Sequence, residues 1–445
     1  MRLYLGVDLG STTSKAVLVD DDERVVGRGI TNTRSNYDVA VEIARRDAMT
    51  DARLALALRL LGRDGQAVAE AFWVESDLHR LEALRQTCRA TASAIPGEGP
   101  RLAPAVDVIL ARMADEGSTL FNATARSRGS FFRDIVSARF HALAEEQCAR
   151  SGVDFERVLG IYDRAILDAE NQLLDLPFVD VFAASVDRAG LHGERREAAI
   201  AVGREVAHAA FDVAGFVGTG YGRARLPFPR ECIRSEILCH GLGAHAMLPA
   251  TRTVLDIGGQ DTKAIQVDGN GIVTGFQMND RCAAGCGRYL GYIADEMSIG
   301  VHELGPLALQ STKPVKINST CTVFAGAELR ELMALGEKRE DILAGLHRAI
   351  VLRAMSLLAR SGGVESEFTF TGGVARNQAV TGALEHLVFE NYGKMTINIS
   401  ADSIFTGAVG AALFAKRDPK GVMSDLEVSK LPGSKACGLA AACPA

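Results

Sequence analysis

A short pattern of Asp, Gly, Lys and Ala at fixed offsets occurs twice in this chain and constrains its fold more than any other feature. The first copy runs from Asp8 to Ala16 and the second from Asp256 to Ala264. Each copy follows one apolar, strand-like segment and precedes a second, and a polar turn and a third such segment come next. Two copies of one hairpin unit predict two α/β domains of similar fold that face each other across a cleft.

The residue types in this pattern suit the binding of nucleotide phosphates. Gly10 and Gly258 leave room for backbone N–H groups to approach phosphate oxygens. Asp8 and Asp256 are predicted to flank the site and to hold Mg²⁺ largely through its water ligands. One copy alone is typical of an ordinary strand-turn-strand unit, but two copies in register favour a phosphate site. The predicted phosphate-binding residues of the first copy are Gly10, Ser11, Thr12, Thr13 and Lys15.

A further glycine-containing segment lies nearer the C-terminus. The residues from Phe368 to Thr371 have the composition of a buried strand, and a turn at Gly372 and Gly373 leads into a predicted helix. Such a turn admits a flat ligand, as an adenosine pocket requires, although a plain strand-to-helix connection has the same pattern. The segment 402–412 has small residues at helical spacing, which indicate close helix packing.

The character of the chain changes between residues 36 and 211. Apolar residues recur there at helical spacing, with charged residues on the opposite face. The predicted helices are 38–61, 67–89, 131–150 and 154–174, with a Gly- and Pro-rich loop at 95–104. We interpret 36–211 as a mainly helical insertion in the first domain. The predicted division is 1–250 for the first domain, 251–401 for the second, 402–417 for a C-terminal helix that packs back on the first, and 418–445 for an irregular tail.

The composition excludes some classes of function. A net charge of -6 and a pI of about 5.9 argue against a nucleic-acid partner, which usually leaves a basic footprint. No apolar run reaches the ~18 to 20 residues of a membrane span, and the first residues enter a strand-like segment instead of a signal peptide. The nine cysteines are irregularly spaced, as is typical of reduced thiols. We therefore predict a cytoplasmic protein with no nucleic-acid or membrane partner.

Two cysteines stand in distinctive polar segments between the second copy of the pattern and the strand at 368–371. Cys282 lies in the run 279–288 and Cys321 in the run 318–324. Thiolates bind soft metals, so these segments join metal chemistry to nucleotide chemistry. A [4Fe–4S] cluster takes four thiolates, and two are too few. A cluster held by these cysteines would therefore need a second subunit.

Taken together, these motifs closely resemble one family of ATPases. They are similar to the activator ATPases of 2-hydroxyacyl-CoA dehydratases and to the ATPase subunits of ATP-dependent benzoyl-CoA reductases. The resemblance covers residues 1–34 and about 215–416, and it implies the two-domain fold of the acetate kinase, sugar kinase, Hsp70 and actin superfamily. The motifs that carry it are 6–15, 219–223, 256–261, 279–285, 319–325 and 371–375.

The resemblance also implies roles for individual residues. Cys282 and Cys321 match the ligands of a [4Fe–4S] cluster shared by two ATPase subunits, with ATP and Mg²⁺ as further cofactors. Asp8 and Asp256 match the acidic residues near Mg²⁺, and Gln260 matches the position from which the attacking water would be oriented. The remaining matches are the first phosphate loop at 10–15, the second at Gly258, Gly259 and Asp261, and the adenosine turn at Gly372 and Gly373.

Two departures from the activators bear on the function. Cys286 stands where activators have Thr, which predicts either a spare thiol beside the cluster or a buried small apolar residue. The resemblance implies that activators are compact and lack the insertion, whereas the larger ATPase subunit of benzoyl-CoA reductases is extended in this way. The insertion therefore favours the reductase.

We predict an ATPase-coupled oxidoreductase subunit that passes low-potential electrons from ferredoxin through the shared cluster to a benzoyl-CoA reductase. The predicted partners are a shorter homologous ATPase subunit and two catalytic acyl-CoA reductase subunits. The nearest alternative is an activator of a 2-hydroxyacyl-CoA dehydratase, in which electrons only initiate turnover. A sugar or acid kinase with structural thiols and a chaperone-like ATPase are alternatives from other classes, and iron with acid-labile sulfide would separate the redox functions from both.

Overall fold

Two β-sheets of matching topology organise the chain, for which a computed structural model describes residues 1–33, 36–122, 131–171, 177–279, 286–297, 299–313, 315–317 and 322–419. The strands of the first sheet, in spatial order, are β3 (Val25–Asn32), β2 (Thr13–Val19), β1 (Arg2–Leu9) and β4 (Asp212–Thr219). Those of the second are β7 (Val273–Asn279), β6 (Thr262–Val267), β5 (Thr253–Ile257), β8 (Phe368–Thr371) and β9 (Ile397–Ile399).

The repeated sequence pattern forms the same antiparallel hairpin in both sheets. Asp8 in β1 pairs with Lys15 in β2, and Asp256 in β5 pairs with Lys263 in β6. Each first strand also pairs in parallel with a strand from much later in the chain, β1 with β4 and β5 with β8. The prediction of two similar α/β units is confirmed, and the similarity extends to a fourth strand that the repeat did not reveal.

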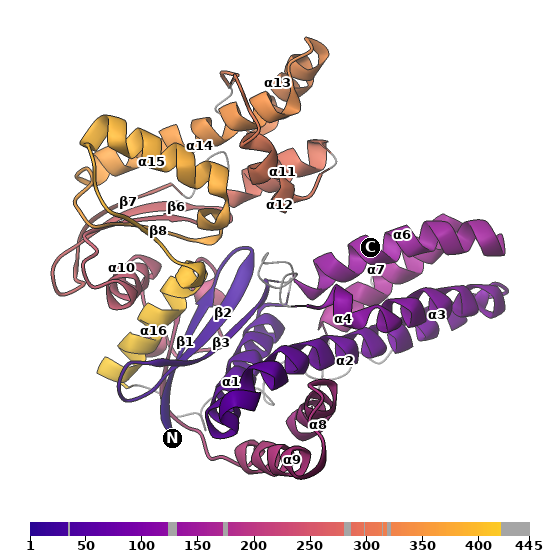
Figure 1. Cartoon of the computed structure of the whole chain (residues 1–445). Helices are drawn as coiled ribbons and strands as arrows, with labels where there is room; N and C mark the ends of the chain where they lie inside the picture. Colours follow the sequence, from indigo (N-terminus) through magenta and orange to yellow (C-terminus); the bar gives the residue numbers. More distant parts are fainter. Residues whose placement is uncertain are drawn as a thin grey trace, which may run out of the picture.

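Two helices lie between the sheets, α10 (Glu236–Met247) and α16 (Thr406–Arg417) (Figure 1). Helix α16 packs on β1 and β4, and α10 packs on both α16 and the second sheet. A Cβ atom on Gly243 would lie 2.0 Å from the carbonyl oxygen of Thr406, and one on Gly410 would lie 1.9 Å from that of Cys239. The two helix backbones therefore touch, and they connect the two halves of the molecule.

The first helix of the insertion, α1 (Tyr37–Leu61), covers the other face of the first sheet. A Cβ on Gly27 in β3 would lie 2.2 Å from the carbonyl oxygen of Ala48, and one on Gly29 would lie 2.0 Å from that of Ala44. Because neither strand position carries a side chain, the helix lies directly on the strand backbone. The insertion is thus packed into the first domain through its first helix.

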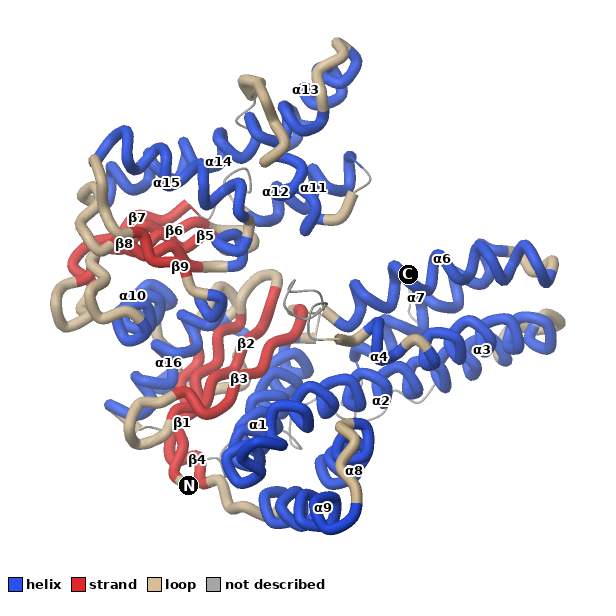
Figure 2. Tube along the Cα trace, in the orientation of Figure 1, coloured by secondary structure: helices blue, strands red, loops and turns tan. Residues whose placement is uncertain are grey.

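The remaining helices of the insertion form a second layer and a projecting arm (Figures 1 and 2). They are α2 (Gly65–Ser93), α3 (Gly99–Asp115), α4 (Gly117–Leu120), α6 (Phe132–Ser151), α7 (Phe155–Asn171), α8 (Phe178–Arg188) and α9 (Gly193–Ala207). Apolar residues of α2, α3, α6 and α7 share one core along the arm, and α8 and α9 pack against α1 and α2. The four predicted helices correspond to α1, α2, α6 and α7.

The predicted loop at 95–104 holds up to Glu98 and is wrong from Gly99, where α3 begins. Pro100 lies in the first helical turn, where a backbone N–H would have no acceptor within the helix, so the lack of this group in proline costs no helical hydrogen bond. Pro104 lies inside the helix, but Leu102, Val106 and Ile109 are buried on the face that meets α2. Burial of these side chains outweighs the local cost of proline, so tertiary packing decides this segment.

Further helices pack in the second domain, on and beside the second sheet (Figure 1). They are α11 (Gly287–Met297), α12 (Val301–Ala308), α13 (Thr322–Ala334), α14 (Arg339–Ser361) and α15 (Gln378–Tyr392). Within the described residues, α14 has the length and apolar content of a membrane span, yet most of it is buried inside the protein. It packs on β6, β7 and α15, as the central helix of a domain core does. The short helices are η1 (Gly62–Asp64), η2 (Arg223–Arg225), η3 (Arg230–Cys232), η5 (Gly373–Arg376) and η6 (Ala401–Phe405).

Candidate nucleotide site and cluster segments

The two predicted phosphate loops face each other between the sheets. Each is closed by an equivalent bond: the N–H of Gly10 donates to the carbonyl of Thr13 at 3.2 Å, and that of Gly258 to the carbonyl of Asp261 at 2.9 Å. A Cβ atom on Gly259 would lie 2.0 Å from Thr12 Oγ1. The loops therefore approach so closely that glycine is required at 259, and the structure brings together the loop residues that the repeat predicts.

Thr33, the residue that follows β3, holds the first loop in place through two hydrogen bonds. Thr33 Oγ1 donates to the carbonyl of Gly10 at 2.7 Å, and the Thr33 N–H donates to the carbonyl of Thr12 at 2.8 Å. Lys15 Nζ lies 3.2 Å from Asp8 Oδ2 and 3.2 Å from the position of a Cβ on Gly10. The lysine ammonium group is thus held beside the loop by one carboxylate.

The equivalent lysine of the second hairpin has a different environment. Lys263 Nζ lies 2.8 Å from Asp261 Oδ1, 3.4 Å from Asp256 Oδ2 and 4.0 Å from Glu236 Oε2. Burial alone would lower the pKa of Lys263, but these three carboxylates raise it above its usual value. The charge of this lysine is therefore neutralised within the protein, and the Asp261 carboxylate is engaged with it.

Asp256 is a buried carboxylate with several stabilising contacts. Thr371 Oγ1 donates to its Oδ1 at 2.8 Å, and its Oδ2 faces Lys263. Burial alone would raise the pKa of Asp256, but the nearby His240 and Lys263 and the bond from Thr371 lower it to about 2. Asp256 is consequently ionised at neutral pH, as a carboxylate that binds the water ligands of Mg²⁺ must be.

His240 belongs to this site although no sequence motif pointed to it. It lies on α10 and is only 7% exposed, and its Nδ1 is 2.8 Å from the carbonyl oxygen of Glu236. Its Nε2 is 3.6 Å from Asp256 Oδ2. The one available signal is the pairing of a glutamate and a histidine four residues apart in a helix that, apart from His245, is otherwise apolar.

Two glycine turns pack directly against the two aspartates of the candidate site. Gly372 has φ of 89°, and a Cβ there would lie 2.3 Å from the carbonyl oxygen of Ile257 and 3.1 Å from Asp256 Oδ1. Gly220, which follows β4, has φ of 98°, and a Cβ there would lie 2.3 Å from Asp8 Oδ1. Gly220 is thus the first-domain equivalent of Gly372, a correspondence that the repeat did not predict.

The other predicted residues of the site lie at its edge. Gln260 is half-buried at the tip of the second loop. A Cβ on Gly373 would meet no described atom within 4 Å, so the turn has open space on that side. The assignments of Gln260 to the attacking water and of Gly373 to adenosine stay predictions.

The second loop is bonded directly to the start of α11. The Gly287 N–H donates to the carbonyl of Gly258 at 2.9 Å, and the Arg288 N–H donates to the carbonyl of Gly259 at 2.7 Å. A Cβ on Gly287 would also lie 3.3 Å from Val374 Cγ2, just after the glycine turn. The first turn of α11 therefore contacts both the phosphate loop and the predicted adenosine turn.

The predicted cluster ligands, Cys282 and Cys321, lie outside the described residues, but the helices that follow them are described. Helices α11 and α13 run side by side in parallel, since Gly326 faces Tyr292 and Arg330 pairs with Glu296 one turn further along both helices. Both helices begin shortly after a cysteine segment. The N-terminal ends of both helices therefore lie at the same end of the pair, and the assignment of Cys282 and Cys321 as cluster ligands stays a prediction.

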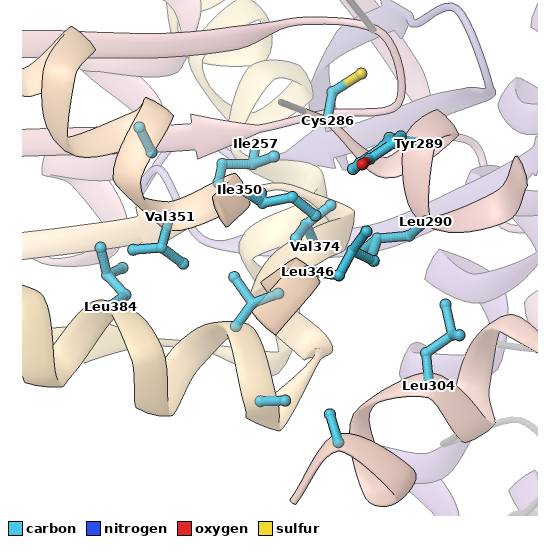
Figure 3. Packing of buried hydrophobic residues seen from close by; sticks show 14 of the residues in the cluster. Ile257, Cys286, Tyr289, Leu290, Leu304, Leu346, Ile350, Val351, Val374 and Leu384 are labelled. Atoms are coloured by element: carbon cyan, nitrogen blue, oxygen red, sulfur yellow. The ribbon is translucent and has the colours of Figure 1, made fainter. Parts of the chain in front are cut away.

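Cys286 lies at the start of the second-domain core. Its side chain is 1% exposed and packs among apolar residues, and Figure 3 shows it at one end of this core with Tyr289, Ile257 and Val374. This environment fits the interpretation of Cys286 as a buried small apolar residue better than that of an accessible spare thiol.

Comparison with known proteins assigns the family. The sequence profile of the BadF/BadG/BcrA/BcrD ATPase family matches residues 5–415. The chain belongs to this ATPase family. Its relatives include the (R)-2-hydroxyglutaryl-CoA dehydratase activating ATPase of Acidaminococcus fermentans, which is 45% identical over 204 residues, 46% of this chain and 76% of the relative. A benzoyl-CoA reductase subunit of Thauera aromatica is 32% identical over 175 residues, 39% of this chain and 62% of that relative.

A solved structure of the same family shows the fold. The crystal structure of component A of (R)-2-hydroxyglutaryl-CoA dehydratase from Acidaminococcus fermentans matches with a TM-score of 0.50 and 24% identity, over 94% of this chain and 98% of that chain. The predicted two-domain actin-like ATPase fold is therefore confirmed. The sequence-based prediction put the benzoyl-CoA reductase function before that of a dehydratase activator. The comparisons favour the activator, because the activating ATPase is the more similar of these two relatives.

Proposed function

We propose that the protein is an ATP-driven electron-transfer ATPase that activates a 2-hydroxyacyl-CoA dehydratase. The higher identity to a dehydratase-activating ATPase supports this partner. The observation that carries the coupling of ATP to electron transfer is the pair of backbone bonds from α11 to Gly258 and Gly259. Through them the second phosphate loop is joined to the segment that contains Cys282 without any intervening side chain.

The proposed cofactors are ATP, Mg²⁺ and a [4Fe–4S] cluster shared with a second subunit. Cys282 and Cys321 would supply two of its four ligands, and the second subunit the others. When bound, the cluster takes up and releases one electron at a time. The adjoining N-termini of α11 and α13 support this donor set, because partial positive charge at a helix N-terminus favours thiolates.

In the proposed ATPase site, each group has one task. The loop N–H groups and the hydroxyls of 11–13 bind phosphate oxygens, and Lys15 adds a positive charge beside Asp8. Asp8 and Asp256 hold the water ligands of Mg²⁺ from opposite domains. Gln260, at the tip of the second loop, orients the attacking water. Lys263 keeps Asp256 ionised and does not reach phosphate, since carboxylates surround it.

The coupling follows from which atoms are bonded. A phosphate that moves the second loop must carry the carbonyls of Gly258 and Gly259 with it, and these carbonyls accept the hydrogen bonds from the first turn of α11. Helix α13 lies beside α11, with Gly326 against Tyr292 and Arg330 paired with Glu296, so we expect a movement of α11 to reach α13 as well. By linkage, if bound nucleotide changes the equilibrium constant for reduction of the cluster by some factor, reduction of the cluster must change the affinity for nucleotide by the same factor.

A benzoyl-CoA reductase ATPase subunit is the second candidate, and the helical insertion is the observation that favours it. In that case, the proposed partners are a shorter homologous ATPase subunit, two catalytic acyl-CoA reductase subunits and ferredoxin. The two candidates differ in how ATP is used. An activator delivers an electron that initiates many turnovers, whereas a reductase consumes ATP for each electron it transfers.

The ratio of ATP hydrolysed to product formed tests the choice. The anaerobically purified protein would be combined with each catalytic component, reduced ferredoxin and Mg-ATP. We expect dehydration of 2-hydroxyacyl-CoA with product in large excess over ATP hydrolysed. Benzoyl-CoA reduction at a fixed ratio of ATP to product would support the reductase instead, and activity with neither component would contradict both.

The cluster assignment has its own test. Cys282→Ala should remove iron, acid-labile sulfide and the low-temperature EPR signal of the dithionite-reduced protein, because three ligands from two chains hold a cluster poorly. Cys286→Thr is the matched control and should leave all three signals unchanged, since Cys286 packs in the apolar core. An undiminished cluster in Cys282→Ala would overturn the assignment.

A further inference from the structure

The turn after β4 contains an exposed residue, Tyr221, that the proposed ATPase site does not use. This turn has the same backbone as the glycine turn after β8. In each, the N–H three residues after the first glycine donates to the carbonyl of that glycine at 3.2 Å. The two first glycines, Gly220 and Gly372, have φ of 98° and 89°. Tyr221 is therefore the first-domain equivalent of Gly373.

The backbone of Tyr221 is held at the edge of the first sheet where the candidate site lies. Strands β1 and β4 run parallel, so their carboxyl ends meet at this edge. A Cβ on Gly220 would lie 2.3 Å from Asp8 Oδ1, and the N–H of Gly222 donates to the carbonyl of Leu9 at 2.8 Å. Both neighbours of Tyr221 thus contact the end of the strand that leads into the first phosphate loop.

The side chain of Tyr221 is 54% exposed, and none of the described residues forms a hydrogen bond with its hydroxyl group. A tyrosine hydroxyl can donate a hydrogen bond, and a bond to a charged oxygen is stronger than one to a neutral oxygen. The two domains face each other across the predicted phosphate site, so equivalent turns lie on opposite sides of it. Because adenosine is predicted at the second-domain turn, the first-domain turn is nearest the other end of the nucleotide, its terminal phosphate.

We infer that the hydroxyl of Tyr221 donates a hydrogen bond to the terminal phosphate of bound ATP, so that this residue distinguishes ATP from ADP. The inference rests on the proposed ATPase function and deepens it. The two equivalent turns then have different tasks. Gly373, with open space where a side chain would be, admits adenosine, and Tyr221 contacts the phosphate that hydrolysis removes.

Removal of the hydroxyl group tests this contact. Tyr221→Phe keeps the aromatic ring and loses only the donor. Tyr392→Phe is the matched control, because Tyr392 lies at the far end of α15 from the predicted adenosine turn, where its ring borders Gly363. Calorimetry on anaerobically purified full-length protein would measure the binding of Mg-ADP and of a non-hydrolysable Mg-ATP analogue, with thermal unfolding of each variant.

We expect Tyr221→Phe to bind the ATP analogue about tenfold more weakly than wild type, the effect of one hydrogen bond to a charged oxygen, and to bind ADP within about twofold of wild type. Its melting temperature should be unchanged, since the side chain is exposed. Tyr392→Phe should match wild type with both nucleotides.

Equal losses for both nucleotides in Tyr221→Phe, or no loss for either, would overturn the inference. The ATPase proposal would survive either result, because wild type would still bind both nucleotides. Wild-type protein that binds neither nucleotide would overturn the ATPase proposal and this inference with it.

Discussion

In the first hairpin, Lys15 contacts one carboxylate, that of Asp8 at 3.2 Å, whereas its equivalent in the second hairpin, Lys263, lies within 4.0 Å of three. The strand register is the same in both, and so is the hydrogen bond that closes the loop. Lys15 is 12% exposed at its side chain, and Lys263 is 3% exposed. The same backbone thus holds one lysine that can still meet a phosphate and one whose charge is already satisfied.

The surroundings of the two loops differ in the same way. The first loop is fixed by Thr33 at the end of β3, and the second by the first turn of α11. The side chain of Thr371 donates to Asp256, but its equivalent Thr219 donates to the carbonyl of Arg234 and leaves Asp8 to other partners. These contacts support the proposal that the first hairpin binds the ligand and that the second transmits movement to α11.

The largest expected difference comes from making the same substitution at both lysines. Lys263→Met should lower the free energy of unfolding by about 3 to 5 kcal/mol, because it leaves buried carboxylates without their counter-charge. Lys15→Met should lower the free energy of unfolding by less, because it removes the counter-charge of one carboxylate rather than of several, and it should also weaken Mg-ATP binding. Urea unfolding and nucleotide binding measured on both variants check this. Equal destabilisation would mean that the two hairpins are equivalent after all.

Replacement of the aspartates tests what the hairpins still share. Asp8→Asn and Asp256→Asn should each lower kcat for ATP hydrolysis by about 100-fold or more, because each removes a charge from the proposed Mg²⁺ site. Only Asp256→Asn should also lower the melting temperature, since Asp256 balances the buried Lys263. Near-normal turnover in both variants would make the repeat a relic of the fold rather than a site.

The connection to α11 belongs to the second hairpin alone among the described contacts of the two loops. Gly287→Ala places a Cβ 3.2 Å from the carbonyl oxygen of Gly258 and should loosen that connection. In wild type, ADP and a non-hydrolysable ATP analogue should give different midpoint potentials of the cluster, and this difference measures the coupling. In Gly287→Ala we expect the coupling factor to fall about tenfold, or about 1.4 kcal/mol. Gly291→Ala, on the same helix with open space around it, is the control and should keep the full shift. Identical shifts in both variants would contradict the proposed route.

The smallest expected effect is on acid stability and arises from Asp256. Its pKa is about 2, below the ordinary value of 3.8, so its stabilising contribution is complete above about pH 4 and is lost as the pH falls through 2. Between about pH 6 and about pH 3, wild type should lose about 1 kcal/mol more unfolding free energy than Asp256→Asn. Urea unfolding at the two pH values measures this difference, and parallel losses would show that Asp256 is not held ionised in the folded protein.

The sequence predicted the parts of the site that are local in the chain. The repeat contains Asp8, Gly10, Lys15 and their equivalents in one short pattern, and strand pairing then brings each Asp beside its Lys. It could not predict that Glu236 and His240 join them, because α10 reaches the site only through packing between the sheets. The equivalence of Gly220 and Gly372 was hidden for the same reason, since it lies in parallel pairing between distant strands.

In the insertion, periodicity predicted the long amphipathic helices but not how they are attached. The contact with α1 depends on Gly27 and Gly29, which lie two residues apart on one face of β3 and carry no side chain that would mark this face as buried. Helices α8 and α9 lie within the predicted helical insertion but outside its four predicted helices, and their buried residues meet α1 and α2. Composition located the insertion, and only packing shows where it can be separated from the first domain.

This packing has a practical consequence for shortening the chain. A deletion of 36–211, as composition alone suggests, would remove α1 and expose the apolar faces of β2 and β3 to water, with Ala44 and Ala48 no longer covering the strand glycines. A cut placed after Leu61 would instead keep that cover and remove the arm. The position from which the insertion can be deleted without uncovering the first sheet thus lies one helix beyond the position at which the composition of the chain changes.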